Sequence, residues 1–177
     1  MMGRRSVRPA LLGALSGVAI AAMAPLAEAA TKIIARSGSW EAFGGTTDKG
    51  KPVCGVSQTA GDVYFGFKFF AGNDIYTIQV GNKAWRIDNG AKLKIAMNFD
   101  GNATWNATGT GFHFDDGDPG LEFTVQVGEA NQFLAEFRNS ARLRMQFPGS
   151  MTPDLMLSLG GTGALMDPLL ACIRNLR

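Results

Sequence analysis

The sequence predicts a mainly β protein: an antiparallel β-sandwich or small barrel with a short C-terminal helix and one disulfide. Three observations predict it. Apolar and polar residues alternate along six segments, turn-forming Gly, Asn and Asp residues separate many of these segments at short intervals, and two cysteines follow an export-like start. The close spacing favours hairpins over the long helical crossovers that parallel strands need.

The first 29 residues have the order of a secretory signal. Three arginines precede an apolar run at 10–23, and small residues follow, with Ala27 and Ala29 in the A-x-A pattern of a cleavage site. We expect a cleaved signal peptide at 1–29 and a single β-rich domain at 30–177, periplasmic or secreted. The run is too short and too rich in glycine for a membrane span, so no transmembrane segment is expected after cleavage. The Sec and twin-arginine export routes both remain open.

Cleavage changes the charge of the chain. The whole sequence has 17 Lys and Arg against 15 Asp and Glu, and the expected signal contains three arginines and one glutamate. The remaining domain is therefore neutral, which gives no electrostatic basis for binding nucleic acid.

The alternating segments each have one apolar face and one mostly polar face, as in antiparallel sheets with one buried side. They are 63–69, 76–80, 93–99, 121–127, 143–147 and 155–159. A further strand is expected around Cys54. Turn signals lie between several of the segments, the strongest being Asn89-Gly90, because both residues tolerate the positive φ of a tight hairpin. A helical patch at 129–140 interrupts the strands, with apolar residues at helical spacing.

The glycine-rich stretch at 157–172 resembles a phosphate-binding loop at first sight, but it has no P-loop lysine, and no βαβ unit can follow it. Asp167 and Pro168 are instead a good helix start, as a capping oxygen and a residue without an N–H. The glycines would let the chain leave a strand and turn back over the sheet. Cys172 then lies on the apolar side of a C-terminal helix.

An even pair of cysteines in an exported chain is most simply one disulfide. Cys54 and Cys172 would close most of the domain into one loop, and the chain-entropy model assigns such a loop roughly 4 to 5 kcal/mol of stability before strain. Cys54 as a nucleophile served by His113 is the alternative, and no other residue pattern supports it.

Catalytic patterns are mostly absent from the sequence. It contains neither G-x-S-x-G nor H-E-x-x-H, and its single histidine is His113. Carboxylate pairs occur in any chain of this size, so an acid/base pair is neither excluded nor indicated. We expect no enzyme activity and no cofactor.

Asp115, Asp116 and Asp118 form the densest acidic cluster, in a turn rich in Gly and Pro. Three carboxylates on a flexible loop could supply part of a calcium shell. The simpler interpretation is a solvated turn, because turns select these residue types, and the spacing does not match the twelve-residue calcium loop.

Tryptophans and outward basic residues are the remaining candidates for binding. Trp40, Trp85 and Trp105 could stack on sugars or partner proteins, although tryptophans are more often core residues; we expect a polar loop around Trp105. Five outward basic residues would form one face if their strands adjoin, and a solvated surface is the simpler interpretation: Lys68, Lys92, Lys94, Arg142 and Arg144.

Short motifs at both ends of the expected domain resemble a known family. Trp40 in "GSWEAFG", Cys54 in "VCGVSQT" and the closing "LSLGGTGAL" with its later cysteine are similar to the invasion-associated locus B family of small exported bacterial proteins. Members often have a further cysteine just after the tryptophan, where this chain has Phe43-Gly44. The resemblance implies a periplasmic or surface β-rich protein without known catalysis, and it supplies no active site.

The sequence therefore predicts an exported, non-enzymatic protein with a binding, envelope or host-interaction role and an unknown envelope or protein partner. Two alternatives stay open. One is an enzyme acting on carbohydrate or peptidoglycan through the aspartates at 115–118 beside Trp105. The other is an inhibitor of a secreted hydrolase on a rigid β scaffold.

Overall fold

A computed structural model describes residues 30–176, so the expected signal peptide at 1–29 lies outside the described residues. Ten antiparallel strands form one sheet in the order β1-β2-β3-β4-β5-β8-β7-β6-β9-β10. The strands are β1 (Thr31–Ser37), β2 (Trp40–Thr46), β3 (Pro52–Ala60), β4 (Val63–Phe70), β5 (Ile75–Asn82), β6 (Lys92–Phe99), β7 (Trp105–His113), β8 (Pro119–Gln126), β9 (Arg142–Gln146) and β10 (Leu155–Ser158). The helices are α1 (Val127–Asn139), the 3-10 helix η1 (Thr162–Leu165) and α2 (Met166–Arg174).

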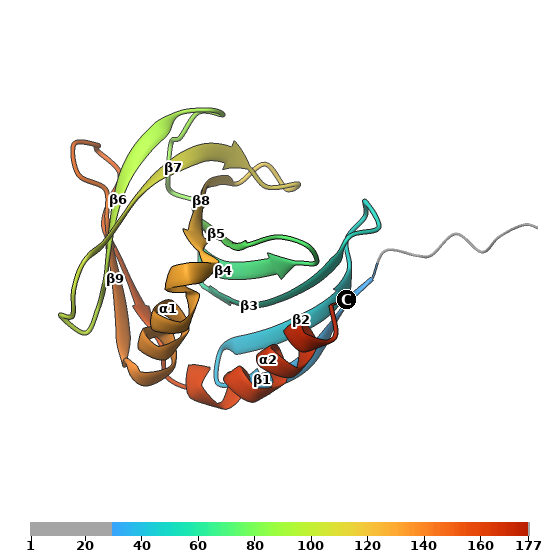
Figure 1. Ribbon diagram of the computed structural model, residues 1–177. Helices are drawn as coiled ribbons and strands as arrows, with labels where there is room; N and C mark the ends of the chain where they lie inside the picture. Colours follow the sequence, from blue (N-terminus) through green and yellow to red (C-terminus); the bar gives the residue numbers. More distant parts are fainter. Residues whose placement is uncertain (1–29, 177) are drawn as a thin grey trace, which may run out of the picture.

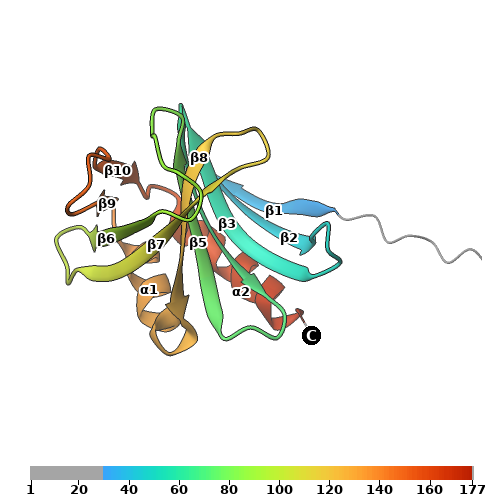
Figure 2. The same ribbon diagram turned by 90° about the horizontal axis from the view of Figure 1, so that it is seen from above.

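The sheet curls strongly, and α1 lies inside the curve (Figure 1). Seen from above, β1–β2 and β9–β10 lie at its two ends, and α2 lies below β2 and β3 (Figure 2). The expected antiparallel β architecture with a C-terminal helix and one disulfide is confirmed. The form it takes is a single curled sheet that does not close by strand pairing. Within residues 30–176, no helix has the length and apolar character needed to cross a membrane.

A side-chain hydrogen bond and a close backbone contact connect the two end regions of the sheet, which do not pair as strands. The indole Nε1 of Trp40, at the start of β2, donates a hydrogen bond of 3.1 Å to the carbonyl oxygen of Ser158, the last residue of β10. Close backbone contact at the same place leaves no room for a side chain, since a Cβ on Gly161 would lie 2.7 Å from the carbonyl oxygen of Ser37. The two ends of the sheet are therefore joined through Trp40 and the chain at 158–161.

The core lies between the inner face of the sheet and α1. Phe133 and Phe137 of α1 are fully buried, and the ring of Phe137 packs edge-on against Phe67 and Trp40 with centroids 5.0 and 5.1 Å away. Edge-to-face aromatic pairs add about 0.5 to 1.5 kcal/mol each beyond the area they bury. The helix therefore fills the interior that an open sheet would otherwise expose.

All six predicted strands are present, and so is the predicted helix at 129–140, which α1 matches closely. The prediction of a polar loop around Trp105 is wrong, because residues 105–113 form β7. Its inner positions include Gly109 and Gly111, where a Cβ would lie 2.7 Å from Ile95 and 2.3 Å from the Asp88 backbone. Close neighbours leave room only for glycine at these two positions. The inner face of β7 therefore lacks the apolar residues by which alternation reveals a strand.

The C-terminal segment has the predicted chain reversal but a different helix start. Gly161 has φ of +100°, a conformation that side chains disfavour, and η1 follows it. The N-cap of α2 is Leu165, so the expected capping role of Asp167 is wrong: it lies in the first turn, where its charge favours the helix dipole.

The predicted disulfide is confirmed between Cys54 of β3 and Cys172 of α2. Gly44 on β2 makes room for it, because a Cβ there would lie 2.5 Å from the Cys172 sulfur. The bond attaches α2 to the inner face of β2 and β3, and it joins positions 118 residues apart in sequence.

Candidate functional site

The outer face of the sheet has an unusual row of glycines beneath aromatic rings. Tyr64 pairs in register with Gly81, and Gly81 pairs with Gly120, across β4, β5 and β8. The ring of Phe114 lies over both glycines, since a Cβ on either would come within 2.7 Å of it. Phe114 also packs against Tyr64 and Phe112, with centroids 5.2 and 4.6 Å away. Glycine in a strand marks close approach by another group, and here that group is an aromatic cluster.

A cavity of about 430 Å³ opens on the outer face beside this cluster. We call it the outer cup. It combines glycine backbone, aromatic rings and polar groups from β3, β4, β5, the loops at their ends and the β7–β8 turn. Its lining residues are Thr59, Gly61, Asp62, Tyr64, Lys68, Gln79, Gly81, Asn82, Lys83, Phe114, Asp116 and Asp118. Its volume is within the range of roughly 300 to 1,000 Å³ typical of small-molecule sites.

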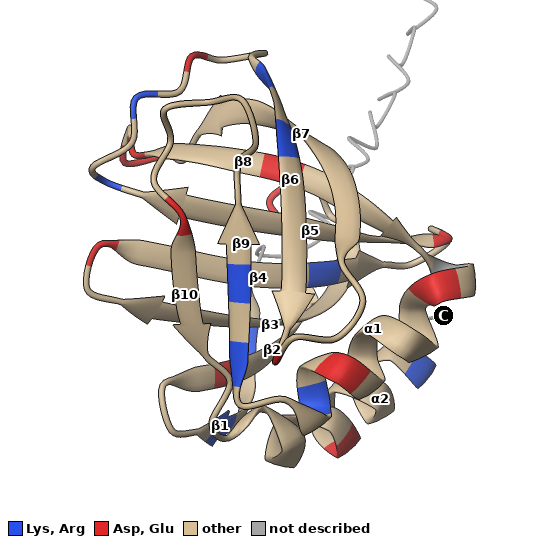
Figure 3. Cartoon of the chain, turned by 90° about the vertical axis from the view of Figure 1, so that its left-hand side faces the viewer, with Lys and Arg blue, Asp and Glu red and all other residues tan. Residues whose placement is uncertain are grey.

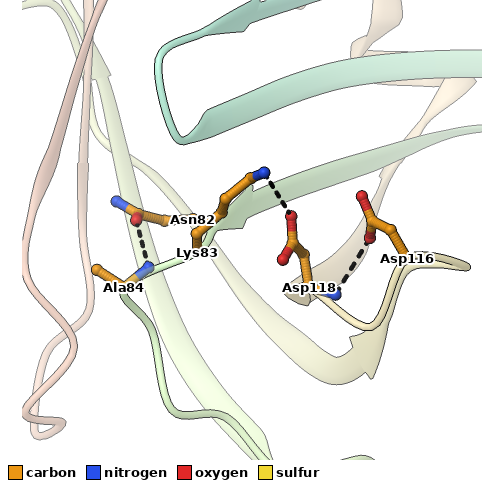
Figure 4. Close-up of polar contacts among 5 residues, drawn as sticks. All are labelled: Asn82, Lys83, Ala84, Asp116 and Asp118. Atoms are coloured by element: carbon orange, nitrogen blue, oxygen red, sulfur yellow. Dashed lines mark hydrogen bonds and ion pairs between the residues drawn. The ribbon is translucent and has the colours of Figure 1, made fainter.

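The loops around the outer cup are fixed by local bonds (Figure 4). In the β7–β8 turn the Asp118 amide donates to Asp116 Oδ1 over 3.1 Å, and Asp118 Oδ2 lies 3.6 Å from Lys83 Nζ. After β5, Asn82 Oδ1 accepts from the Ala84 amide at 2.9 Å. The Lys83–Asp118 ion pair is largely exposed and adds at most about 1 kcal/mol, but it joins two loops on one side of the cup.

Burial shifts the pKa values of Lys68 and Tyr64, which both line the cup. Desolvation lowers the pKa of Lys68, and the nearby charge of Glu122 opposes this shift. Desolvation raises the pKa of Tyr64, and a hydrogen bond with Ser57 opposes it. Within residues 30–176, Lys68 Nζ has neither a hydrogen-bond acceptor nor an ion-pair partner, and Glu122 instead accepts from Gln79 at 2.7 Å. A half-buried ammonium without a partner can donate to a bound molecule.

The three aspartates predicted as calcium ligands are all in the β7–β8 turn. Asp116 and Asp118 line the outer cup, whereas Asp115 is exposed and is not among the lining residues. Throughout the described part of the chain, no group of three or more His, Cys, Asp or Glu side chains is placed to hold a metal ion.

The three candidate tryptophans occupy different places. Trp40 and Trp85 are 0% and 4% exposed, so neither presents a surface to a ligand. Trp105 is half-buried at the start of β7 and donates to Glu136 Oε2 over 2.9 Å. It lines a smaller groove of about 250 Å³ between β6–β7 and the start of α1.

The aspartates and Trp105 do not share a site. They lie at opposite ends of β7, a strand of nine residues, which separates them by about 25 Å at the usual rise per residue. The carboxylates proposed beside Trp105 for a carbohydrate-active enzyme are therefore not beside it.

The outward basic residues do not form one face. Arg144 of β9 pairs with Asn98 near the end of β6, whereas Lys92 and Lys94 lie at the start of β6, and Figure 3 shows the blue segments of the two strands apart from one another. Lys68 is on β4, which β5, β8 and β7 separate from β6.

Sequence reasoning named Lys68 only as an outward basic residue and Asp116 and Asp118 only as possible metal ligands, and it missed the aromatic residues of the outer cup, Tyr64 and Phe114. Their signal was glycine at outward strand positions, at Gly66 and Gly81, where alternation predicts polar side chains. That signal needs the strand order, which the sequence does not supply.

Comparison with known proteins gives one informative result. No family model matches the sequence, and no curated protein matches it. Among solved structures, invasion associated protein B from Bartonella henselae matches with a TM-score of 0.54 and 15% identity, covering 83% of this chain and 99% of that one. The two proteins share a fold. The resemblance expected from the end motifs is thus confirmed for the architecture, and at this identity the match shows the fold alone.

Proposed function

We propose that this chain is an exported, non-enzymatic binding protein with an envelope or host-interaction role, and that the outer cup is its binding site. The observation that carries the proposal is the cup itself. It is an open cavity beside two aromatic rings that lie over strand glycines, and it includes Lys68, a half-buried lysine without a partner among residues 30–176. Aromatic walls with a few placed polar groups are the usual composition of a ligand site.

Export is supported by the disulfide. Disulfides form and persist in the periplasm and outside the cell and are rare in the cytosol. The fold shared with an invasion associated protein is compatible with the same location.

Binding is favoured over catalysis by the use of two of the cup's three carboxylates. Asp118 faces Lys83 and so joins two loops, and Asp116 accepts from the Asp118 amide within the β7–β8 turn. Both carboxylates therefore contribute to holding the loops in place. A rigid set of loops around a preformed cavity suits recognition.

Two measurements test the proposal. Fractionation of a Gram-negative host that makes the full chain should place the protein in the periplasm or medium, starting at Ala30 and without free thiols. Retention in the cytoplasm with two free thiols would contradict export.

For binding, the exported protein is immobilised and exposed to an extract of the host envelope. We expect it to retain an envelope component that Lys68→Met retains poorly. Lys94→Met, on the same face but outside the cup, should behave like the unchanged protein. Equal retention by all three would contradict a role for the cup.

A further inference from the structure

We propose that the outer cup binds a neutral sugar residue, as part of a glycan. This inference rests on the proposed function, because it names the ligand of the same site. Shape, wall chemistry, hydrogen-bonding groups and charge carry it.

The shape of the cup suits a ring-shaped ligand. The side chains missing at Gly66 and Gly81 make room for the protein's own rings, because a Cβ on Gly66 would lie 2.5 Å from the Tyr64 hydroxyl and a Cβ on Gly81 would lie 2.6 Å from the Phe114 ring. Both rings therefore lie close to the strands, and the cavity is beside them. The volume of about 430 Å³ is enough for a small ligand of one or two rings.

The walls present aromatic surface at a fixed angle. Tyr64 and Phe114 both line the cup and pack with an interplanar angle of 72°, so their exposed surfaces are not parallel. A sugar ring has apolar C–H faces and polar edges. Such a ligand can place C–H groups against an aromatic wall while its hydroxyls face polar groups, as amphipathic surfaces require.

The polar groups of the cup are both donors and acceptors. Lys68 can donate, and Asn82 has an amide nitrogen free of hydrogen bonds to residues 30–176, because only its Oδ1 is engaged. Asp62 and the second oxygen of Asp116 can accept. A hydroxyl donates one hydrogen bond and accepts two, so a polyol can satisfy both kinds of group at once.

The charges of the cup favour a neutral ligand over an ion. Two lysines face three aspartates among the lining residues, and Lys83 is already paired with Asp118. An anion that reached Lys68 would also meet the lining carboxylates of Asp62 and Asp116, which have no ion-pair partner among residues 30–176. A cation would meet the Lys68 ammonium, which has no ion-pair partner among these residues either. Because each ion meets a like charge within the cup, a neutral polyhydroxyl ligand pays the smallest electrostatic cost.

The test is an amide chemical-shift titration of the exported protein, purified from cells that make the full chain. The probes are the neutral disaccharides maltose, cellobiose, lactose and diacetylchitobiose at millimolar concentration. Glucuronic acid and glucosamine serve as charged counterparts. We expect at least one neutral sugar to shift amides at 59–68, 79–83 and 114–118, and to bind more tightly than either charged sugar.

Three variants locate the interaction. Lys68→Met should weaken sugar binding about tenfold, the loss of one charge-assisted hydrogen bond. Tyr64→Phe, which keeps the ring, should weaken it less, and Lys94→Met should leave it unchanged. The sugar inference is overturned if no neutral sugar shifts these amides, if a charged sugar binds more tightly, or if Lys68→Met has no effect.

Failure of the sugar inference can be distinguished from failure of the proposed function. If Lys68→Met abolishes capture of an envelope component while the neutral sugars leave the cup amides unshifted, the cup binds something else and only the sugar inference fails. If neither capture nor sugar binding depends on Lys68, both proposals fail.

Discussion

Trp40 joins the two ends of the open sheet, and its role can be tested against a second buried tryptophan. Its indole donates to Ser158 and packs on Phe65 and Phe137. Trp40→Phe should lower the free energy of unfolding by about 2 to 3 kcal/mol, because it removes both a hydrogen bond and core volume.

Trp85→Phe is the matched control in the same urea titrations. Trp85 is equally buried, but its Nε1 has no hydrogen-bond partner among the described residues. We expect it to cost about 1 kcal/mol less than Trp40→Phe, because no bond is lost. Equal losses would show that the Trp40–Ser158 bond adds nothing.

Lys68 gives a prediction for pH. Desolvation lowers its folded-state pKa, so the folded protein resists protonation that the unfolded chain accepts. This cost is present in full below the folded pKa and disappears as pH rises past the ordinary value of 10.5. Lys68→Met should therefore be more stable than the unchanged protein at neutral pH, and its advantage should shrink toward pH 10.5. A constant difference between the two denaturation curves across that range would contradict the burial of the charge.

For individual residues, the sequence predicted the core far better than the candidate site. Alternation correctly places Phe65, Phe67 and Ile78 inward, because burial of one face imposes a period of two. Tyr64 and Lys68 lie on the opposite face, where the same pattern predicts only contact with solvent. Their significance depends on Phe114, which lies in the turn between β7 and β8, the two strands beyond β5 in the sheet.

Among the elements, the turn into η1 and α2 is the most sensitive to one glycine. Gly161 has positive φ, and its missing Cβ leaves room for the Ser37 carbonyl. Gly161→Ala should lower the free energy of unfolding by more than about 2 kcal/mol, as strain and a backbone clash combine. Gly128→Ala in α1 is the control: its Cβ meets nothing within 4 Å, and it should stabilise by up to about 1 kcal/mol. Thermal or urea unfolding measures the stability of both variants. If Gly161→Ala and Gly128→Ala change the free energy of unfolding equally, the close contact between Gly161 and the Ser37 carbonyl is ruled out.

Strands with a clear alternation of apolar and polar residues could be predicted from the sequence. Elements whose residues are dictated by contacts with neighbouring elements could not. The segment at 63–69 alternates cleanly and was predicted as a strand. β7 has glycines where Ile95 and the Asp88 backbone approach, so its inner face lacks the apolar signal. The start of α2 was misplaced for a related reason: η1 continues directly into it, and Leu165 takes the position that Asp167 was expected to hold.

For the whole molecule, the disulfide holds the C-terminal helix to the sheet. Cys54→Ala with Cys172→Ala should cost about 2 to 5 kcal/mol, within the range found for a long closed loop. Urea titrations with and without reductant measure it: the double variant should match the reduced protein. Stability that is unaffected by reductant would mean that the contacts of α2 suffice without the bond.

Strand order was the main feature of the whole molecule that the sequence could not predict. β5 pairs with β8 rather than with β6, and β6 pairs with β9. These pairings bring the β7–β8 turn over Gly81 and so create the outer cup. Antiparallel alternation is the same for many strand orders, so it does not select this one.

We propose the outer cup as the binding surface of an exported protein, and one titration can decide whether it is. Amide chemical shifts of the exported protein are recorded as solubilised envelope glycans are added. We expect the shifts to gather at 59–68, 79–83 and 114–118, and Lys68→Met to reduce them while Lys94→Met does not. Shifts confined to the groove beside Trp105, or to the free edges β1 and β10, would contradict it.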